Sequence, residues 1–284
     1  MDSSACHKTG LSRDPDENGH KYWVEFEAQP FAQGGCRHAF KGIMHGEGPK
    51  EGQMCVVKVP INLYAKEFDC CVPDIAASKM ALRYAEKFNT GCVPLLCKSK
   101  HIVGEMKIQF LLILVAQVEY VAGNDKSFVR QNSYVTIEPF LEGTYRKFNS
   151  NNGYEDDPKG VLLAFTHWTH SISDHNLMIC DLQGVETPRG YILTDPAVHS
   201  LDEMYGNTDL GVYGMVKVLK FHRCSIHCTT LGLSNPLNRD HVQDTKKQVY
   251  HTKYIFQLTE EEKLKAKKRT SEMFSKITPA FEGI

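Results

Sequence analysis

The sequence lacks a surplus of charge of either sign, and it lacks any long apolar run. Its 33 Lys and Arg residues nearly balance 34 Asp and Glu residues, which leaves a formal net charge of -1. A chain so close to neutral has no long-range basic field to drive sequence-independent binding of nucleic acid or anionic membrane. The longest apolar run, residues 110–116, is far shorter than the ~20 residues of a membrane span. We therefore expect no nucleic-acid partner and no membrane span.

The polar N-terminal segment contains no apolar stretch of the kind that forms a secretory signal. Without such a signal, the ten cysteines do not indicate a disulfide scaffold, and a reducing, cytoplasmic location is expected. Most of the cysteines are then free thiols or metal ligands. With 284 residues, 42% hydrophobic and 24% charged, the chain has room for one large domain or two lobes. This composition excludes collagen-like, coiled-coil and wholly disordered proteins.

The first half of the chain reads as strands and hairpins. Residues 1–20 offer little to bury and predict a mobile tail, with ordered structure beginning near Tyr22. Strand and turn patterns over 29–45 and 54–60 predict an antiparallel sheet, and 107–121 predicts one further buried strand. Between them, Pro73 opens a helix with apolar residues spaced at i, i+3, i+4 and i+7.

The composition changes at Glu142–Gly143, after which Asp157 and Pro158 predict the start of a helix. A charged helix is expected near the C-terminus, with Thr259 as its cap. This order of elements favours two lobes with a short connector. The expected divisions are a mobile tail (1–20), an N-lobe (21–137), a connector (138–143), a C-lobe (144–245) and a C-terminal helical extension (246–284).

The segment DLQGVETPRGYILTDPAVHS carries two carboxylates in a predicted hairpin. If the hairpin folds about Pro188, Asp181 and Asp195 lie opposite each other, with Cβ atoms ~5 Å apart, and Gln183 shares the face of Asp181. Two carboxylates so close require a proton or a cation between them. Oxygen ligands from Gln183 and Asp195 fit Mg²⁺. A surface hairpin with two solvated carboxylates is the alternative, and the spacing does not decide between them.

Lys58 and a glycine turn predict contacts with phosphate. Lys58 shares a strand face with Val56, and an inward lysine is costly unless it meets an anion. Gly34 and Gly35 could bind phosphate through their backbone amides, and Arg37 would add a positive charge above them. The alternatives are an edge-strand lysine that faces water and an ordinary hairpin turn.

The segment FHRCSIHCTTLGL contains histidine and cysteine residues at the spacing of metal ligands. His222, Cys224 and Cys228 offer three ligands that suit zinc, and a structural zinc site needs a fourth. His167 is expected to face the interior of its helix, with His170 and His227 as rivals. The alternative is two core cysteines beside a surface histidine.

Together these motifs resemble the alpha-kinases, a family of atypical protein kinases. The resemblance spans roughly residues 22–235 and follows the family's order of motifs, including PFAQGGCRHAFKG, VVKVP, VTIEPFLEGTYRKFNSNNG, AFTHWTH and GNTDLGVYGM. It implies an α+β, bilobal, kinase-like fold with a β-rich N-lobe and a mixed C-lobe stapled by zinc. It also implies transfer of the ATP γ-phosphate to Ser or Thr (most often Thr) of protein substrates, with Mg²⁺.

The resemblance also assigns a role to each matching residue. Asp181 is the implied catalytic carboxylate, and Gln183 and Asp195 are the implied magnesium ligands. His167, His222, Cys224 and Cys228 are the implied zinc ligands. A substrate-side loop is implied at Gly206, Asn207 and Gly211. The implied ATP-binding residues are Gly34, Gly35, Arg37, Lys58, Glu138, Phe140, Leu141, Lys147 and Asn149.

Two other functions stay open on the sequence. One is a non-catalytic pseudokinase scaffold of the same fold that binds ATP, and the other is a zinc-stabilised interaction module. A longer link between the DLQGV and TDP segments, ETPRGY, departs from many relatives and bears on the metal geometry. Autophosphorylation is a further hypothesis, with Ser3, Ser4 and the C-terminal helix as acceptors.

Overall fold

The computed structural model describes residues 6–61, 67–99, 106–123 and 128–237. The chain divides into two compact units. The first comprises residues 1–83, 109–145 and 184–194, and the second comprises 84–108, 146–183 and 195–284. Neither unit is one continuous stretch, whereas the sequence predicted contiguous lobes. No helix in the described part of the chain is both long and apolar enough to cross a bilayer.

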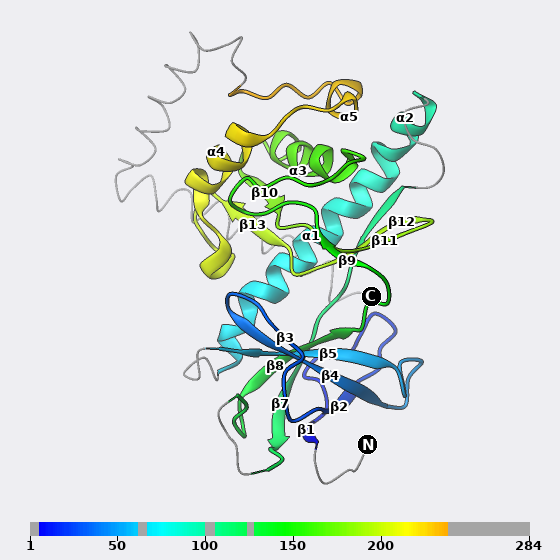
Figure 1. Cartoon of the computed structure of the whole chain (residues 1–284), viewed down its shortest axis with the longest axis vertical. Coiled ribbons are helices and arrows are strands. Elements are labelled where there is room, and N and C mark those ends of the chain that lie inside the picture. The colour runs from blue at the N-terminus through cyan, green and yellow to red at the C-terminus, as the bar shows by residue number, and fades with distance from the viewer. Residues whose placement is uncertain (1–5, 62–66, 100–105, 124–127, 238–284) are drawn as a thin grey trace. The chain divides into compact units, whose positions relative to one another are not determined.

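The first unit contains a seven-stranded sheet in the order β2-β1-β7-β8-β5-β4-β3 (Figure 1). Each neighbouring pair is antiparallel, and an extra pairing between β2 and β4 closes six of the strands into a ring. The strands are β1 (His7–Thr9), β2 (Tyr22–Phe26), β3 (Ala32–Gln33), β4 (Arg37–Gly46), β5 (Met54–Pro60), β7 (Leu114–Tyr120) and β8 (Tyr134–Pro139).

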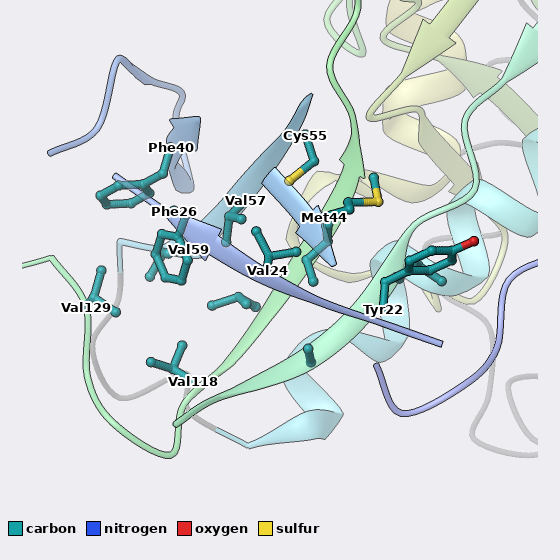
Figure 2. Packing of buried hydrophobic residues seen from close by; sticks show 14 residues of the cluster. Tyr22, Val24, Phe26, Phe40, Met44, Cys55, Val57, Val59, Val118 and Val129 are labelled. Atoms are coloured by element: carbon teal, nitrogen blue, oxygen red, sulfur yellow. The ribbon is translucent and has the colours of Figure 1, made fainter. Parts of the chain in front are cut away.

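Alternation along these strands builds the core of the first unit. In β2, Tyr22, Val24 and Phe26 are buried while the residues between them are half-exposed, as the period of two in a strand requires. Figure 2 shows these side chains packed with Phe40, Met44 and residues of β5 in one hydrophobic cluster. Where β2 meets β4, Gly42 is needed because a Cβ atom there would lie 2.8 Å from the Glu25 carbonyl oxygen.

Two predictions for the first half of the chain are wrong. The tail predicted over 1–20 contains β1, which pairs with both β2 and β7, and Ser12 and Asp16 are buried. The Asp16 carboxylate accepts hydrogen bonds from the Asn18 and His20 backbone amides and pairs with Lys50, which orders this segment. The single strand predicted over 107–121 is two strands, β6 (Lys107–Phe110) and β7, separated by residues 111–113.

The predicted hairpins over 29–45 and 54–60 and the helix opened by Pro73 are confirmed as β3 to β5 and α1 (Val72–Gly91). The division between the units falls within α1. Three further short elements are η2 (Phe68–Cys70), α2 (Val93–Lys98) and β9 (Tyr145–Lys147). In the first unit, residues 184–194 supply most of β11 (Gln183–Thr187) and all of β12 (Gly190–Thr194).

The second unit is mainly helical, with a two-stranded antiparallel sheet (Figure 1). Its elements include α3 (Val161–Ile172), β10 (Leu177–Cys180), β13 (Ala197–Ser200), η3 (Gly206–Thr208), α4 (Gly211–Phe221) and α5 (Ile226–Thr230). The predicted helix after Asp157 is confirmed, although it begins at Val161. The Asp157 carboxylate still orders its start, because it accepts the amide hydrogens of Lys159 and Leu162. The predicted C-terminal helix lies outside the described residues, as do Ser3 and Ser4.

Candidate functional site

In the first unit, a buried lysine pairs with a buried glutamate. Lys58 lies on β5, between β4 and β8, and is 8% exposed. Its Nζ lies 2.5 Å from Oε1 of Glu138 and 3.3 Å from Oγ1 of Thr194. The Thr194 hydroxyl donates to the other oxygen of Glu138 at 2.5 Å. The alternative of an edge-strand lysine facing water is therefore wrong.

Glu138 was predicted to lie in the connector and to be among the ATP-binding residues. It lies instead in β8, with its backbone opposite Val56 and its side chain buried against Lys58. Since Lys58 is opposite Thr136, the two charged residues are diagonal neighbours on one face of the sheet. Glu138 therefore belongs to strand β8 and not to the connector. The segment after β8 begins at Phe140, whose amide donates to the Met54 carbonyl. Leu141 follows it, half-buried.

The glycine turn joins β3 to β4 as predicted. The Gly34 amide donates to the Arg37 carbonyl, and Gly34 and Gly35 are both exposed. The Arg37 guanidinium forms an ion pair with Asp74 in the first turn of α1, and its Nη1 is buried with no hydrogen-bond partner among the described residues. The cation expected above the turn is therefore bound to α1 in this structure.

In the second unit, Asp181 directly follows β10 and forms an ion pair with the Nζ of Lys147. Burial raises the pKa of the Asp181 carboxyl, the Lys147 ammonium opposes that rise, and the nearby Asp195 carboxylate adds to it. Both aspartates have left-handed backbone conformations, with φ of 59° and 48°. Such strain costs ~1–3 kcal/mol per residue and is typical of functional positions. The side chain of Lys147, predicted at the nucleotide, thus contacts the carboxylate.

The two predicted magnesium ligands lie at the same place. The Gln183 side-chain amide donates to the Asp195 carbonyl at 3.4 Å, and the Asp195 carboxylate contributes to the raised pKa of Asp181. The predicted register is off by one residue. Cys180 lies opposite Ala197 because the turn at 188–189 has two residues, so Asp181 and Asp195 are not directly opposed. The alternative of two solvated carboxylates does not hold for Asp181, whose side chain is 17% exposed, whereas Asp195 is exposed.

Asn149 is a positioning residue in this structure. It is 2% exposed, its side-chain oxygen accepts the Leu182 amide at 2.7 Å, and its side-chain nitrogen donates to Thr166 at 2.8 Å. These bonds hold the side chain against Leu182 and Thr166, and its contact with nucleotide stays a prediction. What it fixes is the residue next to Asp181.

The predicted substrate-side loop is organised by an aspartate that sequence reasoning missed. Gly206 begins η3, Asn207 is exposed and Gly211 begins α4. The buried carboxylate of Asp209 accepts hydrogen bonds from the backbone amide and hydroxyl of Ser200 and from the amides of Tyr205 and Gly211. The loop is therefore tied at both ends and is not a freely flexible turn. An acidic residue inside a glycine-rich segment was the available signal.

Four potential metal ligands converge in the second unit: His167, His222, Cys224 and Cys228. Their ligand atoms all lie within 4.8 Å of one another. The Nε2 of His222 is 3.5 Å from Sγ of Cys228, and the Nδ1 of His167 is 3.7 Å from Sγ of Cys224. In a tetrahedral zinc site with ordinary Zn–N and Zn–S bonds, nitrogen and sulfur ligands lie about 3.6 Å apart. The geometry and the ligand types fit zinc.

The electrostatics of this cluster also suit a metal. Burial would raise the pKa of the Cys228 thiol, but contacts with the His167 and His222 rings lower it to about 5. The two rival histidines bond elsewhere. His170 contacts the ring of His175, and Nε2 of His227 lies 2.8 Å from the Lys159 carbonyl oxygen. Among the described residues, the fourth position of the cluster belongs to His167.

The family model for the alpha-kinase family matches residues 32–228. The chain is 33% identical over 217 residues to alpha-protein kinase vwkA of Dictyostelium discoideum, which covers 75% of this chain and 32% of the relative. It is 40% identical over 223 residues to eukaryotic elongation factor 2 kinase of Caenorhabditis elegans, which covers 75% of this chain and 25% of the relative. The chain thus spans about a quarter to a third of these curated relatives.

Solved structures agree on the fold. The alpha-kinase domain of myosin-II heavy chain kinase A in complex with AMP-PNP superposes with a TM-score of 0.64 at 23% identity, covering 82% of this chain and 98% of that domain. An alpha kinase from Entamoeba histolytica superposes with a TM-score of 0.62 at 23% identity, covering 81% of this chain and 92% of that one. From the family match and these relatives, the chain belongs to the alpha-kinase family.

Proposed function

We propose that the chain is a Mg²⁺-dependent protein kinase that transfers the γ-phosphate of ATP to Ser or Thr, predominantly Thr, of protein substrates. The observation that carries the proposal is the pair of strained, adjacent carboxylates at Asp181 and Asp195, with Lys147 on the first of them. Membership of the alpha-kinase family supports it. So does the fold shared with a domain solved in complex with AMP-PNP.

Phosphoryl transfer asks the protein mainly to align the reactants and to offset charge on the phosphates. In the proposed reaction, Asp181 accepts a hydrogen bond from the substrate hydroxyl and then its proton. It must be ionised to do so, and burial alone would favour the neutral acid. The Lys147 ammonium counteracts the effect of burial on the pKa of Asp181 and favours the ionised carboxylate.

The nucleotide is proposed to contact Lys58 and the predicted magnesium ligands. Lys58 neutralises charge on the α- and β-phosphates, and Glu138 with Thr194 holds its ammonium in place. Thr194 directly precedes Asp195 in the sequence. The Asp195 carboxylate and the side-chain carbonyl of Gln183 supply the oxygen ligands that Mg²⁺ prefers, and phosphates and water complete its coordination. Gly34, Gly35, Arg37, Phe140 and Leu141 are proposed to complete the nucleotide contacts.

Zinc is proposed as a structural metal held by His167, His222, Cys224 and Cys228. The four ligands fill a tetrahedral site and leave no open position for substrate, which is the arrangement of structural rather than catalytic zinc. Zinc there stabilises the second unit and takes no part in phosphoryl transfer. None of the ten cysteines, all of which lie in the described part of the chain, is in a disulfide, which supports a reducing compartment such as the cytosol as the place of action.

The test is incubation of the purified chain with Mg²⁺ and γ-labelled ATP, using threonine-containing and serine-containing versions of peptides in an array. Label on the threonine peptides, lost with Asp181→Ala while ATP binding persists, is the expected result. Tight binding of Mg-ATP with no transfer to any peptide or protein would replace this proposal with the pseudokinase alternative. Mass spectrometry of the same reactions tests whether the chain phosphorylates itself.

A further inference from the structure

Outside the four metal-type ligands, one acidic side chain lies directly against the cluster. The Oε1 of Glu155 is 2.7 Å from Nδ1 of His222, and its Oε2 accepts the Arg223 amide at 3.4 Å. The side chains are 15% and 2% exposed for Glu155 and His222, so water does not compete freely for this contact. One carboxylate therefore fixes both the imidazole ring and the peptide that follows it.

This contact selects one tautomer of His222. A carboxylate at hydrogen-bond distance from Nδ1 places the ring proton on that nitrogen, which leaves the Nε2 lone pair available for a metal. That Nε2 is the atom 3.5 Å from Sγ of Cys228, inside the cluster. The ring thus has its donor side toward Glu155 and its acceptor side toward the other ligands.

We propose that Glu155 is the positioning residue of the metal site, holding His222 in the tautomer and orientation that zinc requires. The inference rests on the proposed zinc site. Carboxylates that bind the far nitrogen of a metal-ligating histidine typically contribute 10–100-fold to metal affinity. The residue has no part in the sequence motif of the cluster, which is why the spacing of His and Cys residues did not reveal it.

Glu155 also connects the metal site to the segment that carries the proposed catalytic carboxylate. It forms an isolated β-bridge with Asn149, the residue that binds the Leu182 amide next to Asp181. The turn between them is closed by backbone bonds from Ser150 to Tyr154 and from Asp156 to Phe148. Glu155 therefore contacts both the metal site and the residue that binds the backbone at residue 182.

The experiment measures zinc affinity, not activity, in Glu155→Ala, Glu155→Gln and the matched control Asp156→Ala. Asp156 is the neighbouring carboxylate, but it pairs with Arg146 at 3.3 Å and is 49% exposed. Competition with a chromophoric chelator gives the zinc Kd, and absorption of the Co²⁺-substituted protein reports the coordination geometry. Glu155→Ala is expected to bind zinc about 10–100-fold more weakly than the parent. Asp156→Ala is expected to match the parent.

Glu155→Gln separates positioning from general stability. Glutamine retains an oxygen that accepts from Nδ1 but loses the charge, and charge-assisted hydrogen bonds are about twice as strong as neutral ones. Its zinc affinity should fall between those of the parent and Glu155→Ala, and this variant carries the test if the alanine variant does not fold. A glutamine variant equal to the parent, or an equal loss in Asp156→Ala, overturns the inference. A parent chain that binds no zinc refutes the zinc site itself, which is a separate result.

Discussion

Lys58 and Glu138 face each other from adjacent antiparallel strands of the first unit, with 2.5 Å between Nζ and Oε1. Both residues are less than 10% exposed, and Thr194 bonds to each of them. Desolvating a pair of charges costs more than their attraction alone commonly returns, so such a pair is weak evidence of stability for its own sake. An ordered ammonium in this place is what a phosphate-binding lysine requires.

Removing one charge of this pair should destabilise the first unit strongly. Glu138→Leu takes the carboxylate away from a buried ammonium, which typically costs about 3–5 kcal/mol of unfolding free energy. The double variant Lys58→Met with Glu138→Leu should recover most of that loss. Urea unfolding gives both values. The matched control is Glu25→Leu, which breaks the more exposed pair of Lys8 and Glu25 in the same unit and should cost far less. Equal losses for the two glutamates would contradict the account.

The acidic limb of the pH–activity profile should follow the pKa of Asp181, which depends on Lys147. Burial raises the pKa of Asp181, so the ionised form, and with it kcat/KM, appears only as the pH rises through that elevated pKa. Lys147 lowers that pKa. Lys147→Met should therefore move the acidic limb of the profile to higher pH. Arg146→Met, which loses an exposed pair with Asp156 and a contact with the Phe148 ring, should leave the limb in place. A limb that moves equally in both variants would show that Lys147 does not act on Asp181.

Asn149→Ala should slow the reaction without displacing ATP. The substitution leaves the Leu182 amide without its acceptor, which costs about 1–3 kcal/mol of stability. It also frees the backbone next to Asp181, and misplacement of a catalytic group by about 1 Å costs on the order of 100-fold in rate. Steady-state kinetics should show a large fall in kcat with a nearly unchanged KM for ATP. Asn152→Ala, which loses an exposed bond to Lys217, is the control. A rise in the KM for ATP with an unchanged kcat would indicate instead that Asn149 contacts the nucleotide.

Metal removal should destabilise the second unit. A ligand that binds only the folded state contributes about 2.7 kcal/mol when present at 100 times its Kd. A strong chelator should therefore lower Tm, and zinc should restore it. Cys228→Ser should behave like the chelated parent, whereas Cys36→Ser, at an exposed thiol outside the cluster, should retain both metal and Tm. If the chelator leaves the Tm of the parent unchanged, zinc does not stabilise the second unit.

Local patterns predicted the elements better than they predicted contacts between them. The i, i+3, i+4 spacing after Pro73 indicated α1, and Asp157 indicated the start of α3. The cluster of potential metal ligands could also be predicted, because Cys224 and Cys228 are close in sequence and the helical periodicity around His167 places it on the inward face. Motif order supplied the family, and the family supplied the fold.

What the sequence did not reveal depends on register and on distant partners. The pairing of Glu138 with Lys58 requires the alignment of β5 with β8, which alternation of apolar residues leaves undetermined. The one-residue offset of Asp181 and Asp195 depends on the length of a turn. The order of residues 6–20 depends on β1 binding between β2 and β7, and no short-range pattern in a polar segment indicates such pairing.

In the proposed mechanism, Asp181 acts in phosphoryl transfer and not in holding the nucleotide. This is tested by single-turnover transfer from ATP with Asp181→Asn, alongside Mg-ATP binding by the same protein. We expect the rate constant for transfer to fall by at least about 100-fold, at the lower end of the range for general-base catalysis, while the Kd for Mg-ATP stays within a few-fold of the parent. Transfer at the parent's rate by a folded Asp181→Asn chain would contradict it.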